Sequence, residues 1–528
     1  MINDIRTQLV SLEERGLLVR VKKEINKDTE LHPVVRWQYR GGIPEEERKG
    51  FLFENVVDSR GKRYGMPVAV GIFAGSVQIY AVGLGCQPEE IPLKWEHALA
   101  NPVEPVLVSE GAVHEKVHTG EELTREGGGI DMLPVPISTP GFDCAPFFTC
   151  ANWITKDPET GVRNVGVYRG QVKARNKTGI MFGGPDKDSA VHWRKCQERG
   201  IPLEAALVVG PPLVVGYVGC ERIPFGVDEL SVAGALAGEP LHLVKCKTVD
   251  IEVPAQSEIV IEGILPTDYL EPEGPFGESH GHISPRTLHP CFEVKAITHR
   301  KNPVFVSWIS QLTPSESCTI KRSAYEHLFL KYLRDERRIP SVTRVMMHEP
   351  FTNLRQLLIV QMENPTQTDV WRALHCVIDC EAGVGMIAIA VDKDIDPENM
   401  DAVFWAMSWR MNPEHDVAIV KNRQRGSGPP FKEGETKATR TGTSALLINA
   451  TLRDPFPPVS LPKQEYMERG KAIWEGLGLP RLKPQHPWFG YSLGQWTEEN
   501  EEEARLAVKG DYYLTGDKLA SRKVKPAK

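Results

Sequence analysis

A long series of short β-type runs between residues 115 and 310 constrains the fold more than any other feature of the chain. The runs are rich in valine and isoleucine, and glycine or proline breaks the series at close intervals. Short strands separated by frequent turn residues are typical of a β-barrel or a β-sandwich. The runs expected to form strands are NVGVYRGQVKA, LEAALVVG, LVVGYVG, HLVKCKTVDIEV, SEIVIEGIL, CFEVKAITHR and PVFVSWIS. Residues 226–239 (GVDELSVAGALAGE) predict the clearest helix inside the block.

Segments that mix helix and strand patterns flank this block on both sides. On the N-terminal side, Ile5, Leu9 and Leu12 fall on one helical face, and Gly16 predicts the end of that helix. On the C-terminal side, helices are expected over SAYEHLFLKYLRDE and from residue 368, with strands at VTRVMMH, RQLLIVQM and GMIAIAVD. The later run RQRGSGPPFKEGETK predicts a long loop or a crossing arm.

These elements divide the chain into four predicted segments, and the fold class is α+β. An N-terminal α/β lobe covers residues 1–112, the β-rich block covers residues 113–317, and a C-terminal α/β segment covers residues 318–495. In that third segment, Asp396 is followed by proline and is expected to cap a helix. The tail, residues 496–528, opens with an acidic run that predicts a solvent-exposed helix.

Length, charge and cysteine content exclude several classes of protein. A chain of 528 residues is too long for one small core, so two or three domains are expected. The net charge is −7 and the lysine and arginine residues are scattered, whereas binding to nucleic acid needs a clustered basic surface. There is no apolar leader, no run of about 18 apolar residues, and no CxxC pair among the ten cysteines. We therefore expect a cytoplasmic protein without a membrane span.

Several common catalytic motifs are absent from the sequence. There is no GxxxxGK(S/T) phosphate loop, no HExxH pair and no GxSxG elbow. The AVGLGC stretch lacks the third glycine of a dinucleotide-binding loop. Nucleotide hydrolysis, zinc proteolysis and serine hydrolysis are therefore not expected.

One loop carries two acidic residues in a shape unsuited to ordinary helix or strand. It reads Glu273-Gly-Pro-Phe-Gly-Glu278 and continues as Ser-His-Gly-His. The proline favours an extended conformation at Gly274, and Gly277 permits a backbone that other residues resist. Neighbouring carboxylates drive their pKa values apart, which is what proton transfer needs. A surface turn with two solvated acids is the alternative.

Three more polar residues interrupt apolar sequence in the β-rich block. Asn164 and Arg169 lie in the run NVGVYRG, and Glu229 lies near the start of the helix expected at 226–239. Asparagine and glutamate oxygens suit Mg, Mn or K rather than zinc. An arginine near two acids would hold one of them ionised while the other keeps a proton. Each residue also has a structural alternative: a turn asparagine, an outward-facing strand arginine and a first-turn helix acid.

Taken together, these segments resemble the UbiD-type decarboxylases and carboxylases, which use prenylated FMN. The similar stretches are NVGVYR (164–169), PFGVDELSVAGALAGEPLHLVKC (224–246), VPAQSEIVIEG (253–263) and PEGPFGESHGH (272–282), with a weaker match over 395–417. They occur in the family's order and at family-like separations, and the resemblance covers essentially the whole chain. It implies a central split β-barrel of the flavin-reductase type and a C-terminal oligomerisation domain.

The resemblance implies a catalytic network of Arg169, Glu273 and Glu278. Glu278 would donate and accept the proton, and Glu273 would be bridged to Arg169. Asn164 and Glu229 would bind a divalent metal ion, Mn being the expected one, that clamps the flavin phosphate, with a K ion nearby. A separate prenyl-flavin synthase would supply the cofactor, and a homodimer or homohexamer is expected. The residues implied to contact prenylated FMN are Asn164, Val167, Tyr168, Arg169, Met181, Phe182, Gly183 and Glu229.

The sequence departs from the family pattern at two places that concern phosphate binding. Many relatives carry arginine or histidine in the stretch equivalent to residues 181–187, which reads MFGGPDK here, and His192 lies further on. A Gly-Ser-Lys element of relatives reads Thr-Ser-Ala at residues 443–445, so a lysine near the phosphate is lost. The candidates for its replacement are Lys432, Lys437 and Arg440.

The implied reaction is the reversible, non-oxidative decarboxylation of an aromatic or α,β-unsaturated carboxylic acid, free or as an acyl-CoA ester, with release of CO₂. The modified flavin would store electrons while Glu278, its pKa raised by burial and by Glu273, protonates the substrate carbon. Residues 311–316 (QLTPSE) are expected near the substrate. The alternatives are a hydrolase that uses the carboxylate pair or a metal without flavin, and a non-catalytic scaffold that retains the fold.

Overall fold

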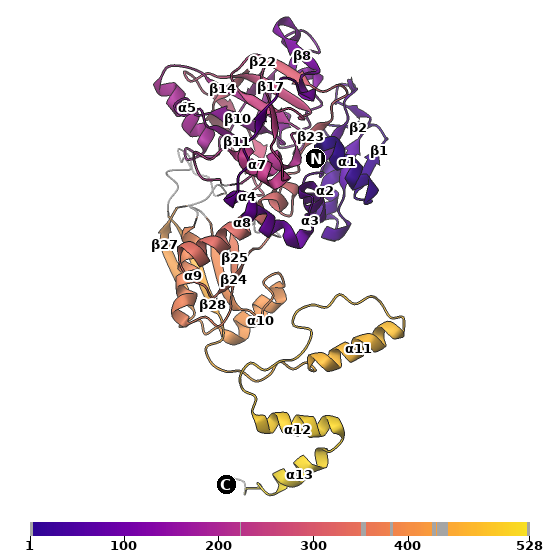
Figure 1. Ribbon diagram of the computed structural model, residues 1–528, viewed down its shortest axis with the longest axis vertical. Helices are drawn as coiled ribbons and strands as arrows, with labels where there is room; N and C mark the ends of the chain where they lie inside the picture. The colour runs from indigo at the N-terminus through magenta and orange to yellow at the C-terminus, as the bar shows by residue number, and fades with distance from the viewer. Residues whose placement is uncertain are drawn as a thin grey trace.

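The computed structural model describes residues 4–221, 223–349, 355–380, 384–424, 429 and 442–524. Figure 1 shows an upper body (residues 4–315), a smaller lower body (316–454) and an extended C-terminal arm (455–524). Both bodies combine helices with sheets. The chain therefore has the mixed helix and sheet fold predicted from the sequence.

A four-stranded sheet at the N-terminal end of the upper body takes its last strand from far along the chain. The order is β1-β3-β6-β23, and β23 pairs in parallel with β6. The pairing of β23 with β6 joins the β-rich block to the N-terminal lobe. The strands are β1 (Leu18–Val21), β3 (Gly50–Phe53), β6 (Val68–Val70) and β23 (Phe305–Ser307), and a small sheet beside them contains β2 (Ile25–Asn26), β4 (Val56–Val57) and β5 (Arg63–Tyr64).

The N-terminal helix forms where the apolar pattern predicts it. In α1, Ile5, Leu9 and Leu12 are buried, and Gly16 follows with φ of +67°, a left-handed conformation that ends a helix. The helices of this lobe are α1 (Ile5–Glu14), α2 (Leu31–Arg40), α3 (Val77–Leu84) and α4 (Ile91–Ala100). Short 3₁₀ turns lie at Glu45–Glu47, Pro88–Glu90, Ala112–His114, Gly120–Leu123 and Gly129–Met132.

The β-rich block forms one curled, nine-stranded antiparallel sheet. Its order is β11-β10-β14-β17-β22-β13-β12-β9, and β8 pairs with β22. The sheet lies between two hydrophobic cores, because alternate side chains of a strand face opposite sides: Leu207 packs in one core and Val208 in the other. The strands are β8 (Lys116–Thr119), β9 (Phe147–Phe148), β10 (Asn152–Lys156), β11 (Arg163–Val167), β12 (Gly170–Ala174), β13 (Lys177–Gly179), β14 (Leu203–Val209), β17 (Ile259–Leu265) and β22 (Cys291–His299).

Shorter strands surround this sheet, and two pairs of them hold the acidic loop. β18 pairs with β21, and β19 pairs with β20. The loop between Glu273 and Glu278 therefore connects two small ladders. The shorter strands are β7 (Val106–Leu107), β15 (His242–Lys245), β16 (Glu252–Pro254), β18 (Glu271–Glu273), β19 (Phe276–Gly277), β20 (Ile283–Ser284) and β21 (Thr287–His289).

One run predicted as a strand is a helix. LVVGYVG forms α6 (Leu213–Val218), in which every residue is buried. A continuous apolar run has no periodicity that separates a buried strand from a buried helix, so the prediction was wrong. The helix predicted at 226–239 is confirmed as α7 (Glu229–Ala237), with Asp228 as its N-cap. The third helix of the block is α5 (Asp188–Glu198).

The lower body contains a five-stranded sheet of order β24-β25-β26-β28-β27. Its inner pairings are parallel and its two edge strands pair antiparallel. The strands and helices predicted here are confirmed. They are β24 (Val342–Met347), β25 (Leu357–Met362), β26 (Ile387–Asp392), α8 (Glu316–Lys331), α9 (Gln367–Asp379) and α10 (Met400–Arg410), and a π-helical turn at Tyr332–Glu336 continues α8. The sheet also contains β27 (Val417–Arg423) and β28 (Thr443–Ala450), which were not predicted.

The start of α10 differs from the prediction. Asn399, not Asp396, is the N-cap, and its side chain accepts a hydrogen bond from Ala402 N. Asp396 Oδ1 accepts from Glu398 N instead, so the aspartate closes a turn one step before the helix. The Asp-Pro pair therefore lies in the turn that precedes the helix and not at its N-cap.

Glu316 joins the two bodies at the start of α8. Its carboxylate accepts hydrogen bonds from the backbone N–H groups of Gly71, Phe73 and Ile309, at 3.1 to 3.2 Å. Burial raises the pKa of this carboxyl to about 7. The last residue of the segment expected near the substrate is thus a structural link between the N-terminal lobe, the β-rich block and α8.

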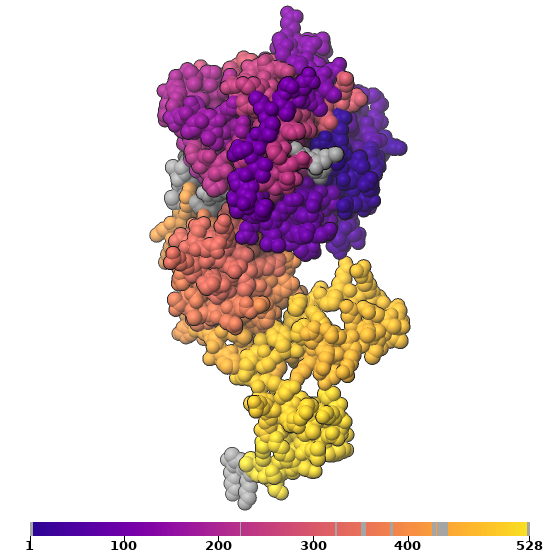
Figure 2. Space-filling model, viewed as in Figure 1, coloured from indigo at the N-terminus to yellow at the C-terminus, as the bar shows by residue number. Residues whose placement is uncertain are grey.

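The C-terminal arm extends from the lower body (Figures 1 and 2), and Lys483 Nζ in the arm donates to Glu46 Oε1 of the upper body at 2.9 Å. Its helices contain no buried residue, and the helix predicted after residue 496 is α12, capped by Thr497. They are α11 (Gln464–Gly476), α12 (Glu498–Lys509) and α13 (Tyr512–Ala520). The run predicted as a long loop or crossing arm, residues 423–437, lies almost entirely outside the described residues. Within the described ranges, no helix is both long and apolar enough to cross a membrane.

Candidate active site

The structure brings Arg169, Glu273 and Glu278 together in one network. Arg169 lies between β11 and β12, Glu273 ends β18, and Glu278 follows β19. Arg169 Nε donates to Glu273 Oε1 at 2.9 Å, and Arg169 Nη1 donates to Glu278 Oε1. One guanidinium therefore bridges both ends of the acidic loop.

Burial couples the charges of this network. Glu273 is fully buried, whereas the Glu278 side chain is 15% exposed. Burial raises the pKa of Glu273, and Arg169 opposes that shift only in part. Burial also disfavours the charged guanidinium, but the two carboxylates outweigh it and hold the pKa of Arg169 above its usual value. The charge states of Arg169 and Glu273 therefore depend on each other.

Hydrogen bonds to neighbouring segments hold the acidic loop in place. Asp143 Oδ1 accepts from Gly277 N at 2.8 Å, and Gln171 Oε1 accepts from Gly274 N at 2.9 Å. Gly274 has φ of +92° instead of the extended conformation expected before proline, because glycine lacks the Cβ on which that restriction depends. Gly277 has no left-handed φ. A Cβ there would lie 2.2 Å from Thr139 Oγ1, so this glycine is needed for close packing.

A glycine on a neighbouring strand sets the position of Glu273. Gly179 ends β13, and a Cβ at this residue would lie 2.2 Å from Glu273 Oε2. The ring of Phe276 lies against the arginine of the network, with its centroid 5.2 Å from Arg169 Cζ. The carboxylate is therefore confined between a backbone and a guanidinium. Sequence reasoning missed Gly179, because the sequence does not show which side chain packs against a glycine in a strand.

Asn164, on β11, and Glu229, on α7, form a second buried polar cluster. Asn164 Nδ2 donates to Ser189 Oγ at 2.8 Å. Glu229, the first residue of α7, accepts a hydrogen bond from Val165 N at 2.9 Å. Burial raises the pKa of Glu229 well above its usual value, and two neighbouring aspartates add to the shift. A cation beside this carboxyl would favour its ionised form.

His192 belongs to this second cluster. Its Nδ1 lies 2.9 Å from Thr155 Oγ1, which in turn lies 3.2 Å from Ser189 Oγ. Burial lowers the pKa of His192 to about 4, so the ring is neutral at pH 7 and able to bind a metal ion. Sequence reasoning did not assign His192 a role. Its spacing from Ser189 could have indicated that the two side chains lie together, because residues three apart share one face of a helix.

The stretches implied to contact the cofactor lie side by side next to the network. Met181 N donates to Arg169 O at 3.3 Å. The rings of Tyr168 and Phe182 meet edge to face, with centroids 5.7 Å apart. The function of these residues as cofactor contacts stays a prediction. The other two implied contacts on these stretches are Val167 and Gly183.

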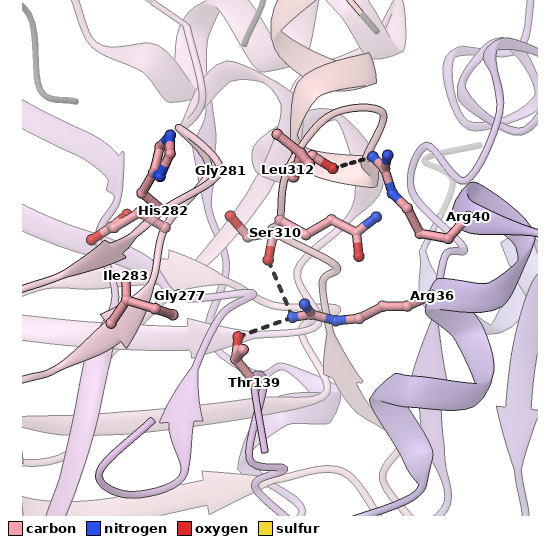
Figure 3. A pocket seen from close by; sticks show the side chains of 11 residues that line it. Arg36, Arg40, Thr139, Gly277, Gly281, His282, Ile283, Ser310 and Leu312 are labelled. Carbon is pink, nitrogen blue, oxygen red and sulfur yellow. Dashed lines mark hydrogen bonds between the residues drawn. The ribbon is translucent and has the colours of Figure 1, made fainter. Parts of the chain in front are cut away.

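A cavity of about 320 Å³ opens beside Glu278 (Figure 3). Arg36, on α2, reaches into it from the N-terminal lobe, and His282 lies on the facing wall. Gln311, from the segment 311–316 expected near the substrate, also lines it. The candidates for phosphate binding lie outside the described residues: Lys432, Lys437 and Arg440.

Family models match three successive parts of the chain. They are the N-terminal, Rift-related and C-terminal domains of 3-octaprenyl-4-hydroxybenzoate carboxy-lyase, over residues 9–99, 107–311 and 320–449. Phenolic acid decarboxylase of Bacillus subtilis is 29% identical over 438 residues, which is 79% of this chain and 86% of that protein.

Solved structures of two relatives share the fold over most of the chain. The UbiD-class enzyme HmfF from Pelotomaculum thermopropionicum, in complex with FMN, has a TM-score of 0.77 at 31% identity and covers 88% of this chain and 99% of its own. An evolved dimeric form of HmfF was solved in complex with prenylated FMN. Vanillic acid decarboxylase from Sedimentibacter hydroxybenzoicus has a TM-score of 0.73 at 25% identity, with coverage of 90% and 99%. The chain therefore belongs to the UbiD family and is a decarboxylase of the carboxy-lyase class.

Proposed function

We propose that this enzyme catalyses the reversible, non-oxidative decarboxylation of an aromatic or α,β-unsaturated carboxylic acid, free or as an acyl-CoA ester, with prenylated FMN as its cofactor. The observation that carries the proposal is the buried Glu273–Arg169–Glu278 network, which borders a cavity large enough for a substituted ring. Relatives named for a substrate decarboxylate phenolic and vanillic acids, which are aromatic acids.

The residues of the site fit a bound flavin. Arg169 Nη2 and Glu273 Oε2 are buried, and no residue in the described part of the chain bonds to either atom, so both can meet a ligand. A buried polar atom without a partner is costly, which favours a bound group that supplies one. When bound, prenylated FMN supplies an electron-accepting carbon that stabilises the electrons of the broken carbon–carbon bond.

The second cluster fits a divalent cation that is shared with a phosphate. Across the described residues, no three His, Cys, Asp or Glu side chains converge as a metal site. We therefore propose that Asn164, His192 and Glu229 supply part of the coordination of a Mn ion and that the flavin phosphate supplies more, with a K ion close by. Hard cations held by one or two carboxylates and by phosphate oxygens follow this pattern.

Glu278 is the group placed to exchange a proton with the substrate. It lines the cavity and is partly exposed, whereas Glu273 is fully buried behind it. Arg169 orients both carboxylates, and the protonated Glu278 delivers its proton to the carbon that has lost CO₂. In the carboxylation direction the Glu278 carboxylate takes the proton back from the same carbon.

The hydrolase alternative gains no support from this geometry. Hydrolytic carboxylate pairs stand on opposite sides of the bond they cleave. Here both carboxylates bond to one guanidinium at one end of the cavity. Membership in a decarboxylase family likewise leaves the scaffold alternative without support.

Glu229→Gln is expected to lower the metal and flavin content of the purified protein. Glutamine keeps the shape of the side chain but removes the charge that holds the cation, and we expect roughly 10- to 100-fold weaker metal binding. The measurement is metal per chain by mass spectrometry and flavin absorbance per chain, after co-expression with a prenyl-flavin synthase. Glu271→Gln is the control, because Glu271 pairs with Lys173 and Lys177 outside this cluster. Unchanged metal and flavin content in Glu229→Gln would contradict the proposed site.

We further propose that the C-terminal arm joins copies of the chain into a homodimer or homohexamer. The three helices of the arm have no buried residue, and large apolar side chains are exposed on all three. Leu477 and Tyr513 are each about 70% exposed. Exposed apolar surface of this extent marks a contact with another chain.

Removal of residues 455–528 is expected to convert the oligomer into monomers. The measurement is the molar mass by light scattering after size-exclusion chromatography. Leu477→Asp with Leu514→Asp tests the same contact by point changes, because a charge in an apolar interface is strongly unfavourable. A wild-type protein that is already monomeric, or a truncated one of unchanged assembly, would rule out this role of the arm.

A further inference from the structure

The guanidinium of Arg36 lies at the edge of the cavity and has no ionic partner among the described residues (Figure 3). Its hydrogen bonds to the part of the chain that the structure describes are all donated by Nη2, to Ser138 O at 2.8 Å, Ser138 Oγ at 3.1 Å, Thr139 Oγ1 at 3.2 Å and Ser310 O at 3.3 Å. Its Nε is buried and unpaired. Nothing in the described ranges accepts a hydrogen bond from Nη1, and no carboxylate there forms an ion pair with this arginine.

The charge of Arg36 persists at neutral pH. Burial lowers its pKa to about 10, and Asp143 opposes that shift, so the guanidinium stays protonated at pH 7. The Asp143 carboxylate is engaged elsewhere, by Gly277 N at 2.8 Å and Thr139 N at 2.7 Å. A partly buried charge whose hydrogen bonds go only to neutral oxygens is costly, and an anion beside it would offset that cost.

The cavity has few competing anions. Glu278 lines it, but that carboxylate is bound to Arg169. Arg40 lies one turn beyond Arg36 on α2 and lines the same wall. The wall formed by α2 is therefore positively charged, and it faces the space where the proposed function places the substrate ring.

We infer that Arg36 binds a second acidic group of the substrate, distinct from the carboxylate that leaves as CO₂, and so selects aromatic diacids. This inference rests on the proposed function, since it takes the cavity as the substrate site. A neutral substituent of the substrate beside Arg36 would leave the charge of the arginine uncompensated. A second carboxylate, in contrast, matches the planar donors of a guanidinium.

The chemistry of decarboxylation favours the second group over the reacting one. The departing carboxylate loses its charge as CO₂ forms, so an arginine bound to it would stabilise the substrate more than the transition state and slow the reaction. A second carboxylate keeps its charge throughout. Its contact with Arg36 therefore strengthens binding equally in both states, which lowers KM and leaves kcat unchanged.

The test compares the binding of matched acids to the flavin-loaded enzyme at pH 7 by isothermal titration calorimetry. Terephthalate and isophthalate carry the second carboxylate, and para-toluate replaces it with a methyl group. We expect at least one diacid to bind the wild type roughly 10- to 100-fold more tightly than para-toluate. Arg36→Gln should remove that preference without changing the affinity for para-toluate, and Arg36→Lys should keep part of it. Equal binding of all three acids by the wild type, or a preference retained in Arg36→Gln, would overturn the inference.

A second variant separates anion binding from a purely structural function of Arg36. Ser138→Ala removes one hydrogen bond that holds the guanidinium but leaves its charge, so it should keep the diacid preference. Loss of the preference in Ser138→Ala and Arg36→Lys alike would show that Arg36 only tethers α2. The comparison of affinities does not require turnover, so failure to decarboxylate any acid would count against the proposed function and not against this inference.

Discussion

Replacement of Glu278 by glutamine is expected to abolish turnover and to leave the flavin content unchanged. Glutamine preserves the shape of the side chain and can still accept a hydrogen bond from Arg169, but it can neither give nor take a proton. Proton transfer by a positioned side chain contributes about 10²- to 10⁴-fold, so we expect kcat to fall by about a thousandfold. The measurement is CO₂ release, or deuterium exchange at the reacting carbon, over a panel of aromatic acids.

Glu271→Gln is the matched control for this substitution. Glu271 lies two residues before Glu273, yet its carboxylate pairs with Lys177 at 2.8 Å and Lys173 at 3.0 Å rather than with Arg169. Most of the activity should therefore survive its loss. Activity retained in Glu278→Gln would remove Glu278 from the reaction. An equal loss in both variants would indicate a general disturbance of the loop.

The elements that local pattern controls could be predicted from the sequence. The apolar face of α1, the short strands of the β-rich block and the helix α7 depend on residues close to one another along the chain. The run that forms α6 could not be assigned correctly, because a fully buried helix and a fully buried strand have the same continuous apolar pattern. Local reasoning also could not show that β23 joins the N-terminal sheet.

The candidate site likewise contains some residues that could be predicted from the sequence and others that could not. Arg169 and Glu273 are 104 residues apart, so no spacing rule pairs them, and their meeting was expected only from the resemblance to a family. Two residues were missed because their importance depends only on where the fold places them. Gly179 lies against the Glu273 carboxylate, and His192 belongs to the cluster that contains Asn164. The sequence predicted a raised pKa at Glu278, whereas in the structure burial raises the pKa of Glu273.

Gly179→Ala is expected to lower kcat by roughly a hundredfold while the protein stays folded. The new methyl group would lie 2.2 Å from Glu273 Oε2, closer than any allowed contact. The obstructed atom is the end of a side chain and not the backbone, so the carboxylate moves and the strand does not. Displacement of about 1 Å from the working geometry can cost about a hundredfold in rate. The measurements are kcat, flavin content and melting temperature of the same preparation.

Two further variants make this explanation specific. Gly170→Ala adds the same methyl group on β12, where its nearest contact, Gly179 O, would be an ordinary 3.4 Å, so this variant should remain near wild type. Glu273→Asp on its own should lose activity, because the shorter side chain withdraws the carboxylate from Arg169. In combination with Gly179→Ala, the same shortening makes room for the methyl group, so the double variant should be less impaired than the two separate losses imply. Strictly additive losses would mean that Gly179 affects the reaction by some path other than the carboxylate above it.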